Sequence, residues 1–309
     1  MIERAAPAQA SSIDIPPLVA SGELLVIASV SGGKDSTALM LALREAEIPF
    51  RAVFADTQWE APETYAYLDT LRAKLGIAID VVGTADGMAG RTQRGAGFPA
   101  RKQRWCTREL KIEPLRAYHD RVTEETGVET VSAMGIRAEE SEARAEMAVF
   151  EDECEGPRSW GGYLWRPLLA WTIADVIAIH HRHGVPMNPL YHAGFDRVGC
   201  YPCIYSRKNE IALIAQRSPG RIDEIEAMER ELTTLRAIRN ADEPGRYRHE
   251  RATFFQTVDR DTDGAMGIRQ IVTWARTTHG GRQLPLLAEP PSGGCMRWGL
   301  CEAPPKEPT

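Results

Sequence analysis

Short apolar runs and amphipathic stretches alternate along the first half of the chain. The run over residues 24–30 is rich in β-branched residues and is bounded by Gly22 and Gly32, so it predicts a buried strand. Further strands are predicted at 50–55, 77–82 and 129–135. Helices are predicted from Thr37 onward, around Tyr65, Leu68, Leu71 and Leu75, and from 107 to 126.

The order of these elements predicts a Rossmann-like α/β fold, in which a parallel, twisted sheet carries helices on both faces. We divide the chain into a flexible N-terminal arm at 1–20, an α/β domain at 21–210 and a helical C-terminal extension at 211–309 that ends in a pair of cysteines. In such sheets ligands bind beyond the carboxyl ends of the strands, which is where we expect a site.

A glycine-rich segment, Ser31-Gly32-Gly33-Lys34-Asp35-Ser36, connects the first predicted strand to the first predicted helix. Two glycines let backbone N–H groups turn inward, the helix N-terminus adds partial positive charge and Lys34 adds a full one, which suits phosphate oxygens. The segment lacks the Gly-Lys-Ser/Thr ending of a Walker A loop. The alternative is a glycine-rich turn with an exposed lysine, but the strand and helix around it favour a phosphate-binding loop.

Two charged segments follow. Residues 83–108 are rich in glycine and arginine, and they predict either a solvated loop or a mobile clamp for the phosphates of a nucleotide or a nucleic acid. Residues 139–155 are acidic and predict a solvated face or a flexible loop.

Two further helices are predicted after these segments. Thr172 is suited to N-cap the first, because Asp175 then lies in its first turn. Histidines near the end of this helix suit the helix dipole better than they indicate a metal site; they are His180, His181 and His183. An amphipathic, charged helix is predicted through residues 222–232.

The composition narrows the class of protein. The net charge is −6 over 309 residues, which argues against a protein that is basic over its whole surface but allows a local basic patch. No run of about 18 uncharged apolar residues and no secretion signal are evident, so we expect a cytoplasmic protein without membrane contact. Six cysteines in a reducing compartment point to metal or redox chemistry before disulfides.

Four ordered motifs give the chain a resemblance to a known family. They are the loop at 31–36, the segment 54–60, the segment Gly135-Ile-Arg137-Ala-Glu139-Glu140-Ser141, and residues 165–168 with 171–176. Over roughly residues 22–210 the chain resembles the phosphoadenosine phosphosulfate reductase family of the ATP pyrophosphatase (adenine nucleotide alpha hydrolase-like) superfamily. Within it, the chain resembles the iron-sulfur branch that is similar to DndC or to the adenylylsulfate reductases. The same group includes the small subunit of ATP sulfurylase and an enzyme of DNA phosphorothioation.

The resemblance implies a site for ATP and Mg²⁺. In the ATP pyrophosphatases the loop holds the departing pyrophosphate, so residues 31–36 would hold phosphates, with Lys34 and Asp35 catalytic and Asp35 near the magnesium ion. Asp56 and Thr57 would lie near the nucleotide, and the adenine would lie against the backbone around Ser29. Arg137 would act across the cleft, where its planar guanidinium suits bidentate capture of phosphate or sulfate.

Cys200 and Cys203 are separated by two residues, so both sulfurs can face one metal centre. Together with Cys106 they resemble ligands of the iron-sulfur adenylylsulfate reductases, with Trp105 at the position of another ligand. The resemblance implies a 4Fe-4S cluster, while structural zinc and free thiols stay open. The fourth ligand is either absent, which leaves one iron open, or one of the remaining cysteines: Cys295, our first choice, Cys301 or Cys154.

These inferences combine into an enzyme that adenylates an oxygen of tRNA or DNA with ATP and supports its replacement by sulfur. The segment 91–108 would bind the nucleic acid, and a cysteine desulfurase or a thioredoxin-like protein would donate sulfur. The first alternative is an adenylylsulfate or phosphoadenylylsulfate reductase in which Cys301 attacks sulfur. The second is a nucleotide-binding subunit similar to the small subunit of ATP sulfurylase. A homodimer is compatible with each of them.

Overall fold

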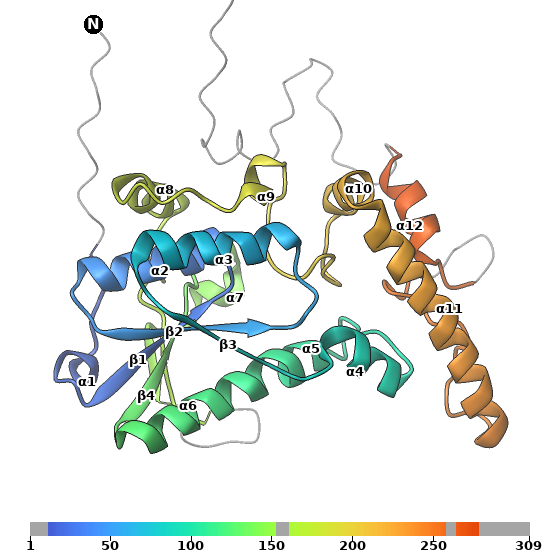
Figure 1. The fold of residues 1–309 in the computed structure, drawn as a ribbon, viewed down its shortest axis with the longest axis horizontal. Coiled ribbons are helices and arrows are strands. Elements are labelled where there is room, and N and C mark those ends of the chain that lie inside the picture. The colour runs from blue at the N-terminus through green and yellow to red at the C-terminus, as the bar shows by residue number, and fades with distance from the viewer. Residues whose placement is uncertain (1–11, 153–160, 258–263, 278–309) are drawn as a thin grey trace, which may run out of the picture.

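The computed structural model describes residues 12–152, 161–257 and 264–277, and its centre is a six-stranded sheet in the order β3-β2-β1-β4-β6-β5 (Figure 1). All neighbouring strands are parallel except β5, which runs antiparallel to β6. The predicted α/β fold is confirmed. The strands are β1 (Leu24–Val30), β2 (Phe50–Asp56), β3 (Ile79–Gly83), β4 (Glu129–Ala133), β5 (Phe150–Asp152) and β6 (Tyr163–Trp165).

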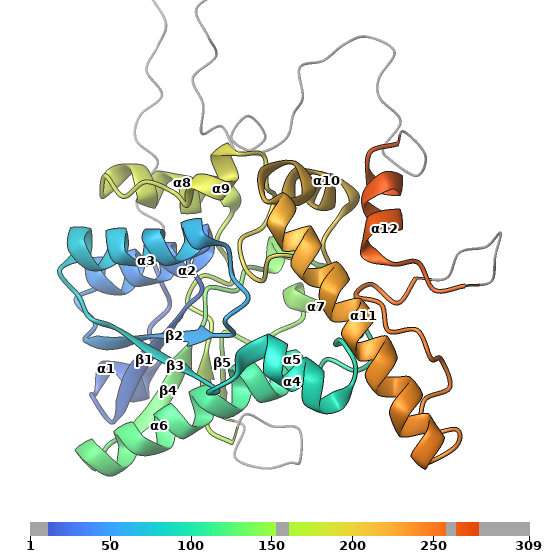
Figure 2. The ribbon, with the colours of Figure 1, turned by 45° about the vertical axis from the view of Figure 1, so that its right-hand side comes forward.

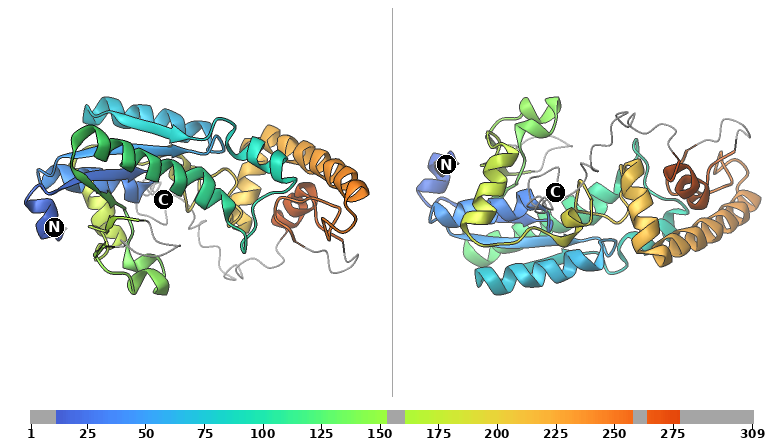
Figure 3. Two further views of the ribbon diagram at one scale, coloured as in Figure 1. Left: turned by 90° about the horizontal axis from the view of Figure 1, so that it is seen from below. Right: turned by 90° about the horizontal axis from the view of Figure 1, so that it is seen from above.

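Helices cover both faces of the sheet, because side chains of the central strands alternate between two apolar layers. Val26 and Ala28 of β1 belong to the cluster on the side of α2 and α3, whereas Ile27 packs with Val53 beneath α6. Figure 3 shows α6 crossing its own face of the sheet. The helices around the sheet are α1 (Pro17–Ala20), α2 (Lys34–Glu45), α3 (Pro62–Leu75), α6 (Glu113–Thr126), α7 (Glu142–Ala145), α8 (Ile173–Arg182) and α9 (Pro189–His192).

A second apolar cluster lies beside the sheet and joins segments that are far apart in sequence. Met88 and Leu110 pack there with Ile214, Ile225 and Phe254. In Figure 2 the long helix α11 runs beside α4, and α12 stands on the other side of α11. These elements are α4 (Gly87–Gly95), α5 (Trp105–Thr107), α10 (Lys208–Arg217), α11 (Pro219–Asp242) and α12 (Ile268–Ala275).

The prediction that residues 83–108 form a solvated loop is wrong in part. The segment contains α4, in which Met88 and Thr92 are buried. Arg236 of α11 donates to the Ala96 carbonyl at 2.6 Å and fixes the end of α4 against the C-terminal helix. The neighbouring sequence does not predict the burial of this helix, because most of the apolar partners of α4 lie far along the chain.

The described part of the acidic stretch, residues 139–152, is also more ordered than its charge predicted. It contains the short helix α7, a 3₁₀ turn, η2 (Ala138–Glu140), and the edge strand β5. Arg166, which is buried, pairs with Glu151 of β5 at 2.8 Å and holds the strand to the sheet. Strands of three residues such as β5 and β6 are too short to show a period, which explains why neither was predicted.

The helix predicted from 107 to 126 begins with a π-helical turn, η1 (Arg108–Ile112), before α6. A π turn accommodates one extra residue, and such turns are frequent at functional sites.

The predicted helix through 222–232 is confirmed as part of α11, and Thr172 caps α8 by accepting from the Asp175 N–H. Across the described residues, no helix combines the length and the apolar character needed to cross a bilayer.

His119 on α6 makes the stability of the fold depend on pH. Its ring is 5% exposed, its Nδ1 lies 2.8 Å from the Thr130 hydroxyl, and burial lowers its pKa to about 4. The unfolded chain binds this proton at about pH 6.5, so stability present above pH 6.5 is lost as the pH falls toward 4. The loss from this group amounts to about 3 kcal/mol.

Urea unfolding between pH 7 and pH 4.5 measures this effect. As the pH falls, we expect the unfolding free energy of His119→Gln to decrease less than that of the wild type. The control is His192→Gln, since His192 is exposed. A variant at 119 with the slope of the wild type would contradict the assignment.

Candidate functional site

The glycine-rich loop lies between β1 and α2 at the carboxyl end of the sheet, where parallel α/β sheets bind ligands. Gly32 has a φ of +71°, and a Cβ at this position would lie 2.8 Å from Thr64 Cγ2. The buried Asn188 donates to the Gly32 carbonyl at 3.0 Å. The loop therefore needs glycine at this position and is fixed by a side chain from beyond α8.

Lys34 is the first residue of α2, and its side chain is largely enclosed, at 8% exposed. The Tyr191 hydroxyl accepts from the Lys34 N–H at 3.2 Å, and the Lys34 Nζ lies 5.3 Å from the centre of the same ring. The two ring nitrogens of His180 lie 2.9 Å from the Lys34 carbonyl and 3.1 Å from the Val185 carbonyl. The enclosed side chain differs from the alternative of an exposed lysine.

Asp35 joins the loop to the residue that follows β4. Its Oδ2 accepts from Lys34 at 2.9 Å and its Oδ1 accepts from Arg137 at 2.7 Å. Burial raises the pKa of Asp35, but the charges of Lys34 and Arg137 outweigh it and hold the pKa below its ordinary value. The structure thus brings together all three residues that were predicted to be catalytic in this region.

This pairing leaves little room for a metal ion held by Asp35 alone. Each carboxylate oxygen already faces a cation, and Arg137 also pairs with Glu139. Adding Mg²⁺ here places a third cation, with two positive charges, beside Lys34 and Arg137. The arrangement fits a magnesium ion that arrives with a nucleotide polyphosphate better than one that is resident in the protein.

The other predicted nucleotide residues surround the same end of the sheet. Ser29 is half-buried on β1, opposite Val53 of β2. Asp56 ends β2 and accepts from the Tyr65 hydroxyl and the Gln58 N–H, each at 2.8 Å. Thr57 is buried and donates its hydroxyl to Glu60. Their contact with a nucleotide stays a prediction, and the Thr57 side chain already has a protein partner.

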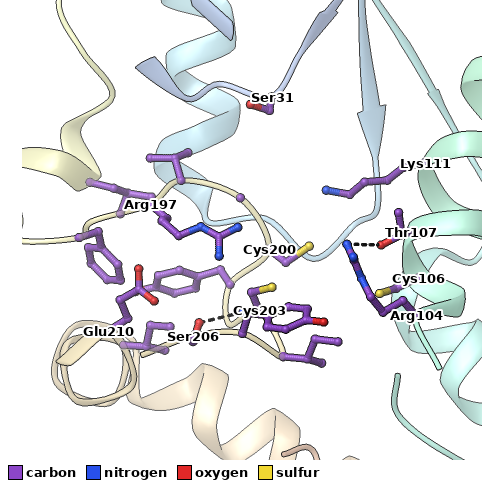
Figure 4. Close-up of a pocket in the computed structure, with 18 residues that line it drawn as sticks. Ser31, Arg104, Cys106, Thr107, Lys111, Arg197, Cys200, Cys203, Ser206 and Glu210 are labelled. Atoms are coloured by element: carbon purple, nitrogen blue, oxygen red, sulfur yellow. Dashed lines mark hydrogen bonds between the residues drawn. The ribbon is translucent and has the colours of Figure 1, made fainter. Parts of the chain in front are cut away.

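Cysteines from two segments line one cavity of about 230 Å³ next to the loop (Figure 4). Cys106 comes from α5, and Cys200 and Cys203 come from the turn after α9. Ser31 of the loop lines the same cavity, together with Arg104, Lys111 and Arg197. The cavity therefore connects the predicted phosphate site to three of the predicted metal ligands; the candidates for a fourth ligand, Cys295, Cys301 and Cys154, lie outside the described residues.

Burial and nearby positive charge act in opposite directions on the pKa values of these thiols. Burial raises the pKa of Cys200 to about 11 and also raises that of Cys106. Lys111 of the π turn lies near Cys200, and its electrostatic interaction with this cysteine raises the pKa of the lysine. Lys111 therefore stays positively charged. Over the ranges 12–152, 161–257 and 264–277, no three His, Cys, Asp or Glu side chains are arranged to hold a single metal ion.

Several residues of the site were missed from the sequence. Tyr191 and Asn188 contact the loop from more than 150 positions away in the sequence. His180 lies at the Lys34 carbonyl, whereas the sequence indicated only an interaction with the dipole of its own helix. Lys111 and Arg197 line the thiol cavity. Lys111 lies five positions after Cys106 and Arg197 three before Cys200, so closeness to the cysteines is the signal that was available.

Asn188 is expected to be essential for the shape of the loop. Its amide donates to the Gly32 carbonyl and its Oδ1 accepts from the Leu190 N–H, each at 3.0 Å. Asn188→Ala leaves both groups without this partner, so the unfolding free energy should fall by about 1–3 kcal/mol and pyrophosphate affinity should fall with it.

The matched control is Asn240→Ala, because Asn240 also makes two hydrogen bonds, to the backbone of Tyr247. Thermal unfolding and pyrophosphate titration measure both variants. The control should lose stability and keep its pyrophosphate affinity. Unchanged affinity in Asn188→Ala would contradict the role assigned to this side chain.

The fold and the loop together define an α/β protein whose glycine-rich loop leads from β1 into α2 at the ligand-binding edge of the sheet. The domain model of the phosphoadenosine phosphosulfate reductase domain matches residues 25–206. The chain belongs to this family.

Two relatives and one solved structure are similar to this chain to different extents. An uncharacterized 37.8 kDa protein of Escherichia phage 186 is 33% identical over 85% of this chain and 91% of its own length. An adenosine 5'-phosphosulfate reductase of Chelativorans sp. is 31% identical over 57% of this chain and 68% of its own length. Among solved structures, the phosphoadenylyl-sulfate reductase of Candida auris in a phosphate complex aligns with a TM-score of 0.44 and 19% identity, over 62% of this chain and 98% of that chain.

Proposed function

We propose that this protein cleaves ATP between its α and β phosphates, adenylates a substrate oxygen and supports replacement of that oxygen by sulfur. The observation that carries the proposal is the shared cavity, in which Ser31 of the loop and the three cysteines line one space. An adenylated oxygen held at the loop would therefore be within the same enclosure as a sulfur site. Proximity of this kind is a principal source of rate enhancement.

The loop residues have the chemistry for the first step. An oxygen of the acceptor attacks the α phosphorus, its proton passes to solvent, and the bond to the β phosphate oxygen breaks with release of pyrophosphate. Lys34 and the amides at the start of α2 offset the negative charge that builds on pyrophosphate. Arg137, held by Asp35, would contact the α phosphate from the segment after β4.

The second step replaces the adenylated oxygen. Hydrosulfide attacks the acceptor carbon, the carbon–oxygen bond breaks, and AMP leaves with that oxygen. AMP is a far better leaving group than hydroxide, which is the chemical reason for spending ATP. Lys111 and Arg104 line this cavity, where their positive charges would stabilise both the incoming hydrosulfide and the departing AMP.

The three thiols fit an iron-sulfur cluster by their chemistry. Thiolates are the ligands that hold such clusters, and these three thiols line one cavity. Lys111 would balance the charge of the bound thiolates. A 4Fe-4S cluster on Cys106, Cys200 and Cys203 would supply sulfide at an iron that lacks a fourth protein thiolate.

Nucleic acid is the acceptor that the surface next to the cavity favours. Arg101, Lys102 and Arg104 are exposed, and the guanidinium groups of Arg101 and Arg104 lie 5.6 and 5.4 Å from the Tyr205 ring. Tyr205 itself lines the thiol cavity. Basic side chains beside an aromatic ring at a cavity are suited to a strand that places a base inside.

A second candidate, reduction of a sulfonucleotide, is favoured by the relative from Chelativorans sp., which is named an adenosine 5'-phosphosulfate reductase. In that reaction Arg137 binds the sulfonucleotide, Cys301 attacks its sulfur, AMP leaves, and a dithiol reductant releases sulfite. This reaction consumes no ATP.

Product analysis separates the two candidates. Protein purified without oxygen is incubated with ATP and Mg²⁺, with and without single-stranded DNA or RNA, and AMP and pyrophosphate are measured. A parallel sample receives adenosine 5'-phosphosulfate with reduced thioredoxin, and sulfite is measured. AMP and pyrophosphate formed only with nucleic acid support the proposal; sulfite without ATP cleavage selects the second candidate.

A further inference from the structure

The phosphate loop and the cysteine pair belong to different apolar clusters. The loop is flanked by β1 and α2, whose apolar side chains lie in the cluster on the sheet. The cysteine turn, which we define as residues 200–203, contributes the buried Tyr201 to the second cluster, together with Ile214 of α10 and Ile222 of α11. The position of the thiols relative to the loop therefore depends on the contacts that join the two clusters.

Trp59 makes such a contact. It lies three residues after the end of β2 and is 1% exposed within the second cluster. Its indole N–H donates to the Pro202 carbonyl at 3.1 Å, and its own carbonyl accepts from the Tyr201 N–H at 2.8 Å. Next to these bonds, Glu60 and Cys200 form an antiparallel bridge. The cysteine turn is thus bonded to the segment after β2 by a side chain and by the backbone.

The C-terminal extension contacts both Trp59 and the turn. The Arg221 guanidinium lies 4.3 Å from the centre of the indole ring, a cation–π contact, and the Phe254 ring stacks on the same indole at a centroid distance of 6.2 Å. The Tyr201 hydroxyl lies 3.2 Å from the hydroxyl of Ser218, which precedes α11. The extension therefore fixes the indole that holds the turn.

We infer that Trp59 is a positioning residue that holds the cysteine turn at the phosphate-binding edge of the sheet, and that the C-terminal extension keeps it in place. The inference rests on the proposed function and deepens it, because it names the residue that keeps the sulfur site beside the adenylated oxygen. Trp59 is not among the described residues that line the cavity, so it acts through the turn rather than by contact with a substrate.

The first readout is amide hydrogen exchange of the full-length protein, purified without oxygen. Trp59→Phe keeps an aromatic ring and removes the indole N–H. We expect the amides of residues 199–206 to exchange about 3- to 10-fold faster, the effect of losing one hydrogen bond. The amides of the phosphate loop at 31–36 should exchange as in the wild type, because the loop is flanked by elements of the other cluster.

The second readout is the amount of sulfur transferred per AMP formed from ATP, sulfide and single-stranded nucleic acid. Trp59→Phe should form AMP at the rate of the wild type, while sulfur transferred per AMP falls about 10-fold. A displaced sulfur site leaves the adenylated acceptor to be hydrolysed by water. A residue that served only the stability of the fold would lower both products together.

Trp165→Phe is the matched control. Trp165 is fully buried in the cluster on the sheet, and its indole N–H also donates to a backbone carbonyl, that of Asp14, at 3.1 Å. This variant should keep the exchange of the cysteine turn and the ratio of sulfur to AMP. Tyr201→Phe removes the bond to Ser218 without a change of ring size, and it should move both readouts in the direction of Trp59→Phe but less far.

Exchange of residues 199–206 at the wild-type rate in Trp59→Phe would overturn the inference. Exchange that rises equally at residues 31–36 would also overturn it, as would AMP and transferred sulfur that fall together. Failure of the proposed function is seen separately, because the wild type would then form no AMP while the turn still exchanges faster in Trp59→Phe.

Discussion

Replacing Lys34 with alanine is expected to lower the rate of pyrophosphate release from ATP by about 10²- to 10³-fold, the usual effect of removing one group that stabilises a developing anion. The side chain is enclosed at the start of α2, with its Nζ between Asp35 and the Tyr191 ring. ATP would draw it toward the β and γ phosphates. AMP and pyrophosphate are the products to quantify.

The fold should survive this change. Alanine is the better helix former, and Asp35 keeps its pair with Arg137 at 2.7 Å. Circular dichroism and thermal unfolding check this point. The control is Lys74→Ala, because Lys74 is an exposed lysine of α3 that donates to the Gly184 carbonyl, away from the loop. Turnover retained in Lys34→Ala would remove the assignment of the loop as a phosphate site.

Replacing Cys200 with serine is expected to remove most of the iron and the visible absorbance of protein purified without oxygen. A serine hydroxyl is a poor substitute for a thiolate at iron, and Cys200 lines the same cavity as the other two thiols and Ser31 of the loop. Iron and acid-labile sulfide are measured per chain. We expect roughly four of each in the wild type, as a 4Fe-4S cluster requires.

The matched control is Tyr205→Phe, which changes the same cavity by one hydroxyl and no sulfur. It should keep its iron. Iron that is unchanged in Cys200→Ser would show that this thiol holds no cluster. Zinc in place of iron in the wild type would assign the cysteines to a structural role and leave ATP cleavage as the function of the loop alone.

The sheet and the loop could be predicted because their signals are local. The run at 24–30 is bounded by glycines, and the following residues are strong helix formers, so β1, the loop and the start of α2 follow from neighbouring residues. Cys106, Cys200 and Cys203 were grouped by resemblance, and the structure places all three on one cavity. Which ligands these groups bind stays a prediction.

The residues that fix the site could not be predicted because their partners are distant in sequence. Asn188 reaches Gly32 and Tyr191 reaches Lys34 across more than 150 positions, and no periodic pattern encodes such contacts. The helix α4 was missed for the same reason, since Met88 packs against the C-terminal helices. Contacts of this kind depend on the tertiary fold rather than on local propensity.

The most direct test of the central claim is the ratio of AMP formed to sulfur transferred. Protein purified without oxygen receives ATP, Mg²⁺, single-stranded nucleic acid and radiolabelled sulfide, and both products are counted in one mixture. The account predicts AMP and labelled nucleic acid in equal amounts, and neither from Lys34→Ala. AMP without transferred sulfur, or sulfur transferred without ATP cleavage, would contradict a shared site for adenylation and sulfur transfer.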